Sequence, residues 1–163
     1  MTQAVDARRL RDVAAAFATG VTIITTSDDS EHHGCAANAV TSLSLDPPLM
    51  LLCLDHAAKT HAKAIAARKF AINILRAGEE SERICRLFAG KGERKFEGLA
   101  WRPGATGVPI LEAAFAWVEC RLERTYEGGD HTIFIGRVVS ADALDDEPLI
   151  FYRGRFRRLI AVG

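Results

Sequence analysis

The chain carries no excess charge of either sign. Its 163 residues include 21 Lys and Arg against 21 Asp and Glu, so the formal net charge is +0 at pH 7. A protein that binds nucleic acid without sequence preference needs a basic surface that displaces counterions from the phosphates. We therefore expect no nucleic-acid partner. Because weak electrostatic self-repulsion makes association easy, the same balance favours a homo-oligomer.

Long apolar runs are also missing. No stretch approaches the roughly 18 residues that a membrane-spanning helix needs. Near the N-terminus, Asp6, Arg8, Arg9 and Arg11 interrupt any apolar segment before Val13, which does not fit a secretory signal. We expect a soluble, cytoplasmic protein without a membrane partner.

Metal and redox motifs are absent too. The four cysteines form no C-x-x-C pair, so buried, reduced thiols are the simplest interpretation; they are Cys35, Cys53, Cys85 and Cys120. His56 and His61 are five residues apart with no third ligand in step, so we expect no metal site. His32 and His33 fall in a polar segment that we expect to be an exposed turn.

Two common enzyme signatures are lacking. No G-x-G-x-x-G motif opens a helix, which excludes a Rossmann domain as the source of nucleotide binding. No G-x-S-x-G motif is present, which weighs against an α/β-hydrolase. With 48% hydrophobic and 26% charged residues, the chain has an ordinary globular composition, and we expect a single domain over residues 1–163.

What is present is a series of short apolar runs separated by turn residues. β-Branched and apolar patterns predict strands over 21–26, 34–38, 49–54, 70–75, 115–126, 132–144, 149–152 and 155–160. The continuous run 49–54 is of the kind that is buried on both faces. Residues 90–107 predict a long surface loop.

Helices are fewer than strands. Asp6 is positioned to cap a first helix with an apolar stripe of Leu10, Val13, Ala14 and Phe17, which Gly20 ends. A second helix is expected over 60–68, and a third from a Ser81 cap through 88. The fold class predicted from these elements is mainly β, an antiparallel barrel with peripheral α-helices.

Four segments then point to a family. In chain order they are Phe17-Ala18-Thr19-Gly20-Val21-Thr22, the run AANAVTSLSLDPP at 36–48, Phe88-Ala89-Gly90, and Gly129-Asp130-His131. Together they resemble the short-chain flavin reductases that accompany two-component flavin monooxygenases, and the resemblance extends from about Arg9 to about Leu159. It implies a Greek-key split β-barrel of the FMN-binding type, which forms a homodimer with flavin bound near the subunit interface. It also implies hydride transfer from NADH to FMN or FAD, after which reduced flavin leaves for a separate oxygenase.

The resemblance assigns the nicotinamide side of the site to the Gly-Asp-His segment. His131 is its proposed catalytic residue, and Asp130 is placed to orient the imidazole. Without the resemblance, the same residues fit a hairpin turn whose histidine packs at a strand end. Further NADH-binding candidates are Phe17, Thr19 and Gly20 from the N-terminal motif, and Tyr152 and Arg155 near the last hairpin.

Flavin contacts are assigned to three further segments. The first is the hydroxyl-rich run Asn38, Ala39, Val40, Thr41, Ser42 and Ser44, which a rigid Asp46-Pro47-Pro48 bend ends. The second joins a strand end to a helix start, where free N–H groups favour an anion, and comprises Cys53, Leu54, Asp55, Lys59 and Thr60. The third contributes Gly90 and Lys95. The residues alone also fit an ordinary Ser/Thr-rich turn, a capped helix start and a solvated charge run.

Two other functions remain open from the sequence. A flavoprotein of the same fold would reduce a different acceptor, such as a corrin or a ferric complex. A non-catalytic split-barrel protein would bind flavin or haem as a store or sensor. The sequence does not choose between FMN and FAD, or between NADH and NADPH.

Overall fold

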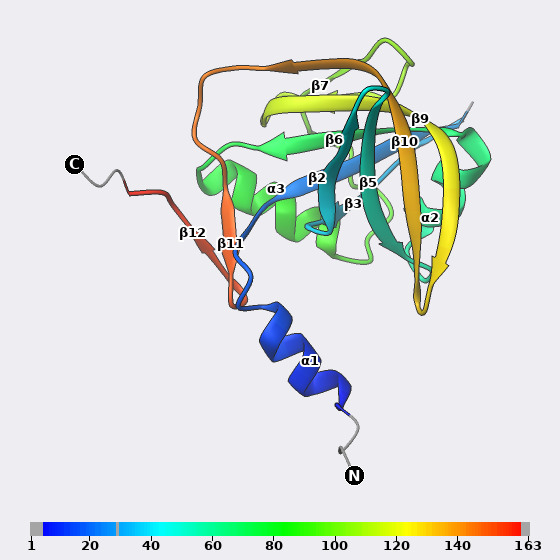
Figure 1. The fold of residues 1–163 in the computed structure, drawn as a ribbon. Coiled ribbons are helices and arrows are strands. Elements are labelled where there is room, and N and C mark those ends of the chain that lie inside the picture. The colour runs from blue at the N-terminus through cyan, green and yellow to red at the C-terminus, as the bar shows by residue number, and fades with distance from the viewer. Residues whose placement is uncertain (1–4, 29, 161–163) are drawn as a thin grey trace.

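Antiparallel strands dominate the computed structural model, which describes residues 5–28 and 30–160 (Figure 1). The main sheet has seven strands in the spatial order β3 (His32–Ala37), β2 (Thr22–Ser27), β6 (Lys69–Leu75), β9 (Ala114–Gly128), β10 (His131–Ala143), β5 (Pro48–Asp55) and β4 (Val40–Leu45). A small sheet joins β1 (Thr19–Gly20), β11 (Ile150–Tyr152) and β12 (Arg155–Arg157), and β7 (Trp101–Pro103) pairs with β8 (Pro109–Leu111). The helices of the described ranges are α1 (Ala7–Ala14), α2 (Lys59–Ala67) and α3 (Glu79–Ala89), and none is long and apolar enough to span a membrane.

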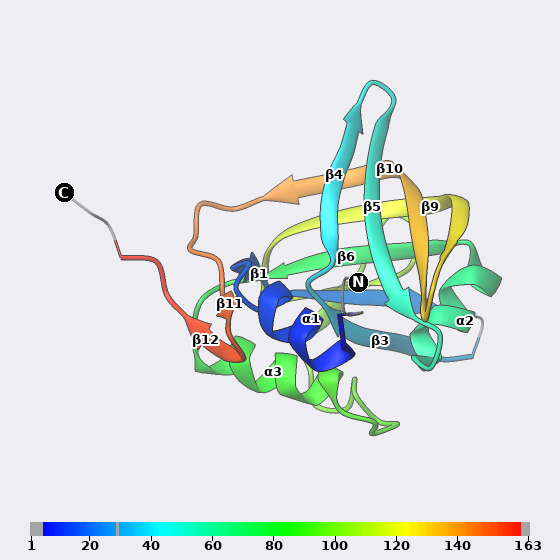
Figure 2. The same cartoon turned by 60° about the horizontal axis from the view of Figure 1, so that its bottom comes forward.

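The main sheet curls back on itself. β3 and β4 form its two opposite edges, yet only Asn38 and Ala39 separate them in the chain. The backbone N–H of Cys53 in β5 donates to the carbonyl of Ala39 at 3.0 Å, which fixes this link against the neighbouring strand. Beyond it, β4 and β5 rise from the body as a long hairpin (Figure 2).

Two hydrophobic cores lie on opposite faces of β2. Ile24 points into a core with Leu52, Phe70 and Phe134, against which Ala64 of α2 packs. Its neighbour Ile23 points the other way, into a core that includes Phe88 of α3. Because successive strand residues face opposite sides, the β-branched run of β2 is buried on both faces. The two helices therefore sit at opposite faces of one strand.

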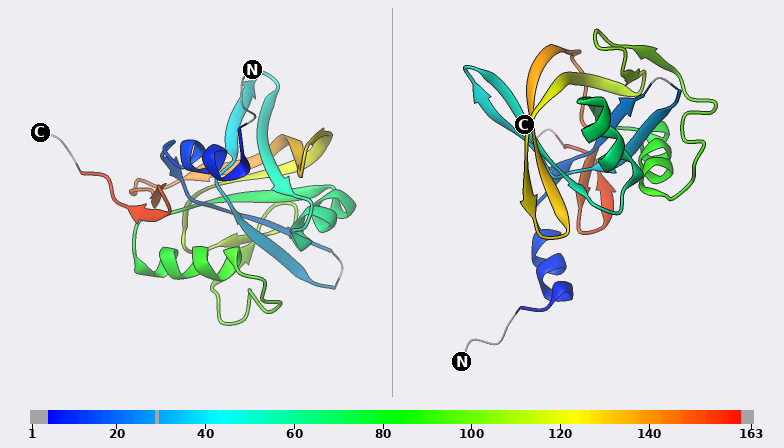
Figure 3. Two further views of the ribbon diagram at one scale, coloured as in Figure 1. Left: turned by 90° about the horizontal axis from the view of Figure 1, so that it is seen from below. Right: turned by 90° about the vertical axis from the view of Figure 1, so that its right-hand side faces the viewer.

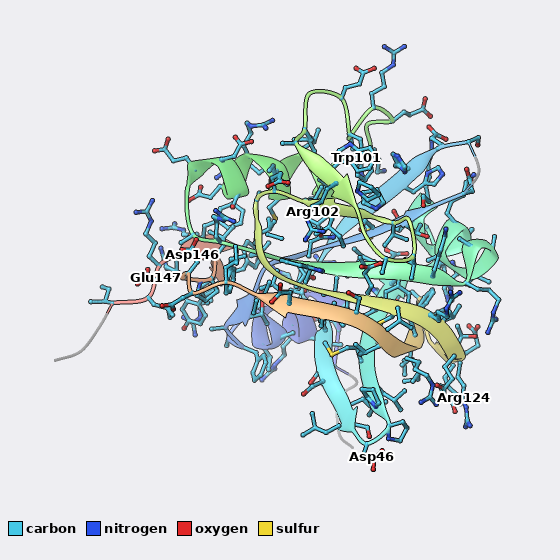
Figure 4. The ribbon with its side chains drawn as sticks, turned by 90° about the horizontal axis from the view of Figure 1, so that it is seen from above. Asp46, Trp101, Arg102, Arg124, Asp146 and Glu147 are labelled. Atoms are coloured by element: carbon cyan, nitrogen blue, oxygen red, sulfur yellow. The ribbon has the colours of Figure 1, made fainter. Side chains whose placement is uncertain are left out.

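The β9–β10 hairpin, two tight bends and one helix cap agree with the sequence patterns. Strands over 115–126 and 132–144 are confirmed by β9 and β10. The tight turn at Arg153-Gly154 is confirmed as well, and both residues have positive φ, 48° and 74°. The rigid bend at Asp46-Pro47-Pro48 falls at the tip of the β4–β5 hairpin (Figure 4). At the N-terminus the carboxylate of Asp6 accepts from the Arg9 N–H at 2.7 Å, as expected of a helix cap.

The predicted extent of the first helix is wrong. α1 ends at Ala14, well before Gly20, and Phe17 lies beyond it in the connection to β1. Gly20 instead belongs to β1, which pairs with β11 near the other end of the chain. The apolar stripe is not buried by residues 5–28 and 30–160, since Leu10 and Val13 are 62% and 66% exposed. Figures 1 and 3 show α1 extending away from the sheets.

Four smaller predictions also differ from the structure. Ser81 does not cap α3, because the helix begins after Gly78 and Ser81 is buried in its first turn. His32 and His33 belong to β3 rather than to an exposed turn, and the His33 ring bonds to Asp28. β5 is not buried on both faces, since only Leu52 and Leu54 are fully buried. The predicted loop over 90–107 also contains β7.

Gly136 is the tightest point of β10 and supplies a test of the packing. A Cβ atom at this position would lie 2.5 Å from Phe70 Cζ and 2.6 Å from Cys120 Cβ. We expect Gly136→Ala to lower the free energy of unfolding by about 1–3 kcal/mol, because the added methyl overfills a closed core. Urea denaturation measures this loss. Gly92→Ala is the control, since its Cβ would meet nothing within 4 Å and should change stability by less than about 0.5 kcal/mol. Equal stability of the two variants would contradict the assigned packing.

Candidate functional site

A cavity of about 740 Å³ lies between the edge strand β3, the start of α2 and the loop that follows α3. A volume of this size is typical of small-molecule and cofactor sites. Ten of the residues predicted from the sequence line it: Asn38, Ala39, Cys53, Leu54, Asp55, Lys59, Thr60, Gly90, Lys95 and His131. The structure therefore brings together one residue pair from the hydroxyl-rich run, the β5–α2 junction, the loop after α3 and the Gly-Asp-His segment.

The remaining predicted site residues lie outside the lining of this cavity. Val40, Thr41, Ser42 and Ser44 are on β4, Asp130 is in the β9–β10 turn, Thr19 and Gly20 are in β1, and Phe17 precedes β1. Tyr152 and Arg155 belong to the β11–β12 hairpin. None of these residues contributes to the lining of the cavity within the described structure of one chain.

His131 faces the cavity at the first residue of β10. Its Nδ1 lies 2.7 Å from Asp130 Oδ1, and the hydrogen bond lowers the pKa of the Asp130 carboxyl. Because a carboxylate only accepts, the Nδ1 atom carries the proton and donates. The other ring nitrogen, Nε2, is left for a ligand. Residues 128 and 129 are both glycine, and Gly129 adopts the left-handed conformation (φ 76°) that this two-residue turn requires.

The start of α2 offers an anion site. Its N-cap is Ala58, whose side chain has no acceptor, so the first N–H groups of the helix remain available to a ligand. Lys59 adds a cation at the same end, and its Nζ lies 2.6 Å from Glu93 Oε1 in the loop after α3. This ion pair lowers the pKa of the Glu93 carboxyl. Both side chains are largely exposed, so the pair is weak and an incoming phosphate competes with Glu93 for the ammonium group.

Lys95 has a different role from Lys59. Its Nζ donates to the carbonyls of Phe88 at 3.0 Å and Gly34 at 3.4 Å, and burial lowers its pKa. These bonds tie the loop after α3 to β3. Lys95 therefore fixes this part of the cavity wall and places its ammonium group beside the cavity.

One end of the cavity has an aromatic wall that the sequence analysis did not predict. The His32 ring packs against Trp101 at 4.5 Å and Phe96 at 5.6 Å between centroids, and Phe96 packs against Phe88 at 5.2 Å. His32 Nδ1 is buried and finds no hydrogen-bond partner among the residues that the structure describes. The signal for this wall in the sequence is the pair His32-His33 next to the predicted strand 34–38. The prediction of an exposed turn for this pair concealed it.

The Cys35 thiol at the cavity is not activated. Cys35 and Cys53 both line it, and burial raises the pKa of the Cys35 thiol. Burial likewise raises the pKa of Cys120, in the core, to about 12. All four cysteines are free, although only Cys120 is fully buried. Within 5–28 and 30–160, no cluster of three or more His, Cys, Asp or Glu side chains is arranged to hold a metal ion.

The site thus combines a helix start without a side-chain cap, a wall of apolar and aromatic side chains, and one imidazole whose Nδ1 is bonded to Asp130. Such a set suits a small ligand that carries a phosphate, with a second polar ligand beside it. No nucleophile–base pair is needed for this. The chemistry that fits is a transfer between two bound rings.

Comparisons with known proteins agree with this geometry. Residues 14–159 match the model of the flavin reductase like domain. The chain is 40% identical over 155 residues to the reductase subunit HsaB of a flavin-dependent monooxygenase from Rhodococcus jostii, which covers 94% of this chain and 78% of that protein. It is 42% identical to an NADH-dependent FAD reductase from Streptomyces globisporus, over 94% of this chain and 86% of that one.

A solved structure is equally similar. The NADH:FAD oxidoreductase SgcE6 of Streptomyces globisporus C-1027, in complex with NAD and FAD fragments, superposes with a TM-score of 0.89 at 40% identity. The superposition covers 98% of both chains.

Proposed function

The chain belongs to the flavin reductase family, and we propose that it transfers a hydride from NADH to FMN or FAD. Reduced flavin then leaves for a separate oxygenase component. The observation that carries the proposal is that one cavity is lined by two groups: the start of α2, which has no side-chain cap and bears Lys59, and the His131 imidazole. One end suits a flavin phosphate and the other suits a nicotinamide.

The residues present fit a flavin. Free N–H groups at the start of α2 and the Lys59 ammonium suit the phosphate, and Thr60 adds a hydroxyl. Small side chains at Ala39 and Cys53 leave room for a flat ring. Bound flavin supplies the hydride acceptor, so the protein contributes binding and alignment.

His131 has the central part in this mechanism. With Nδ1 held by Asp130, its Nε2 hydrogen-bonds the carboxamide of nicotinamide and sets the angle of that ring. No side chain has to act as an acid or a base for the hydride step. Holding the two rings at near-attack distance provides most of the rate acceleration.

The proposed fold is a split barrel. The two-residue link between the opposite sheet edges β3 and β4, and the resulting curl, support this form. The small sheet β1-β11-β12 and the β7–β8 pair lie outside the seven-stranded sheet. Four free cysteines and the use of NADH, both suited to a reducing compartment, support a cytoplasmic location.

A homodimer is also part of the proposal. Large apolar side chains are exposed on α1 and on β4, among them Leu10, Val13, Leu43 and Leu45, the last at 92%. A second copy of the chain covers these surfaces. Thr41, Ser42 and Ser44 lie on β4, while Phe17, Thr19 and Gly20 follow α1 in the chain. We propose that these residues contact ligand across the dimer interface. Tyr152 and Arg155 remain proposed contacts for the outer half of NADH.

The catalytic proposal is tested by NADH oxidation with and without added FMN or FAD. We expect turnover that saturates with added flavin. Replacement of His131 by Ala should raise the apparent NADH KM about tenfold, because one hydrogen bond to a polar ligand group is lost. Flavin affinity should stay within about twofold. The NADH KM of His131→Asn, whose amide oxygen can still accept a hydrogen bond, should lie between those of the wild type and His131→Ala. An effect on flavin affinity alone would refute the role of His131, and no turnover with either flavin would refute the function.

The phosphate site is tested by two opposite substitutions. Lys59→Met should weaken flavin binding, since it removes the cation at the start of α2. Glu93→Gln should strengthen it about two- to fivefold, because it frees Lys59 from an exposed ion pair. Fluorescence quenching of the flavin measures both. Glu97→Gln is the matched control, because Glu97 pairs with Arg94 instead. Weaker binding in Glu93→Gln would contradict the competition.

The dimer is tested by light scattering. We expect a mass about twice the 17.8 kDa of the chain, and a monomer for Val13→Glu, since a carboxylate would be buried in the apolar interface. Ile65→Glu on α2 is the control, since Ile65 is exposed but lies outside the proposed interface. A monomeric wild-type protein would contradict the assembly.

A further inference from the structure

Two histidines that the mechanism above does not use meet at one hydroxyl directly behind His131. Thr132 follows His131 on β10, and successive strand side chains point to opposite faces. His131 therefore faces the cavity while Thr132 points inward, where it is 2% exposed. Thr132 Oγ1 lies 3.0 Å from His56 Nε2 and 2.8 Å from His61 Nε2.

The hydroxyl has a single proton, so it donates to at most one of the two imidazoles. The two ring nitrogens are the partners that the structure gives to Thr132 Oγ1. The arrangement that uses its proton therefore has an unprotonated Nε2 on one ring and a protonated Nε2 on the other. The two rings lie edge to face with centroids 5.2 Å apart, and the His61 ring packs on Phe134 at 5.5 Å, which restricts its rotation.

The same residues hold the turn that carries His131. The backbone N–H of His56 donates to the carbonyl of Asp130 at 3.0 Å. His56 Nε2 also lies 3.5 Å from a carboxylate oxygen of Glu127, which is opposite Thr132 in the β9–β10 register. Three elements thus converge on the turn: the β5–α2 connection, α2 and the β9–β10 hairpin.

We propose that Thr132, His56 and His61 are positioning residues that fix the His131 imidazole for the nicotinamide of NADH. The proposal rests on the function assigned to His131 above. The hydroxyl and the two rings hold the first residues of β10 on the face opposite the cavity, so the backbone position from which the His131 side chain extends is fixed. Asp130 then sets its orientation from the solvent side.

We call the hydrogen-bonded group of His56, Thr132 and His61 the clamp. The strength of the clamp depends on pH through His61. Burial and the charge of His56 lower the pKa of His61, while Glu127 and Asp55 act in the opposite direction. His131 and Asp130 are the other titratable groups at this turn, and Phe134 is the apolar face against the ring. A lowered pKa keeps His61 neutral in the folded protein at and somewhat below the ordinary histidine pKa of about 6.5, so the clamp is intact there. It weakens at lower pH, where His61 takes up a proton, because a charged ring no longer accepts from Thr132.

Kinetics of two threonine variants test the clamp. Thr132→Val keeps the shape of the side chain and removes the hydroxyl. We expect it to raise the NADH KM about tenfold, with kcat and flavin affinity within about twofold, and Thr132→Ser to restore the wild-type KM. The control is Thr26→Val, which loses a comparable buried hydroxyl, bonded to the Lys69 carbonyl, away from the cavity. A KM for Thr132→Val no higher than for Thr26→Val would overturn the proposal.

The pH profile separates positioning from stability. His61→Gln keeps a side-chain amide for Thr132 but does not titrate. We expect the ratio of its kcat/KM to that of the wild type to rise as the pH falls below about 6.5. A constant ratio across that range would contradict a clamp that opens by protonation.

Histidine side-chain NMR decides the point without turnover. In the wild type we expect a protonated Nε2 on one of His56 and His61 and an unprotonated Nε2 on the other. We also expect Thr132→Val, but not Thr26→Val, to shift the His131 resonances. If the protein lacked NADH oxidation, the proposed function would fail while these spectra still tested the clamp. Unshifted His131 resonances in Thr132→Val would overturn the clamp even in an active enzyme.

Discussion

The pairing of β10 with a neighbour on each side is the constraint on which the candidate site depends. β9 pairs with it on one side, and β5 pairs with it on the other from Arg137 back to His131. The register sets His131 opposite Asp55, so the Gly-Asp-His turn arrives beside the end of β5 and the start of α2. A shift of one residue would turn His131 inward and Thr132 into the cavity. Ligand geometry is thereby tied to strand register.

The loop after α3 completes the cavity with two kinds of contact. Lys95 donates to two backbone carbonyls and is partly buried, so it fixes the base of the loop. Lys59 and Glu93 join the loop to α2 through exposed groups, where water competes for both charges. The base is therefore fixed, and the outer part of the wall adapts at small energetic cost. This difference suits a site that has to admit and release a nucleotide.

Local pattern predicted much of the fold because it is set by neighbours along the chain. Alternation and β-branching located β6, β9 and β10, and the Asp6 side chain identified the start of α1. The end of α1 could not be inferred in this way. Gly20 is a plausible helix stop, but pairing of β1 with β11 recruits it into a strand. Ser81 failed as a cap for a similar reason, since helix α3 begins three residues earlier, after a glycine with φ of 138°.

The sequence predicted which segments form the site, but not which residues of each segment line the cavity. The family resemblance directed attention to Asn38, Lys59, Lys95 and His131, which line one cavity. It did not reveal that Thr41 and Ser42 lie on β4, outside the lining of the cavity, because the curl of the sheet depends on long-range pairing. The His56–Thr132–His61 contact could not be inferred either. The spacing of His56 and His61 bears only on a metal pair, and their common partner lies 71 residues further along the chain from His61.

The pairing of β1 with β11 has a consequence for how the chain is made. Thr19 lies opposite Phe151, and the carbonyl of Leu149 accepts from the Val21 N–H. β1 therefore cannot form its pair until β11 has been synthesised. The β2–β3 hairpin, in contrast, forms from residues that are close together in the chain.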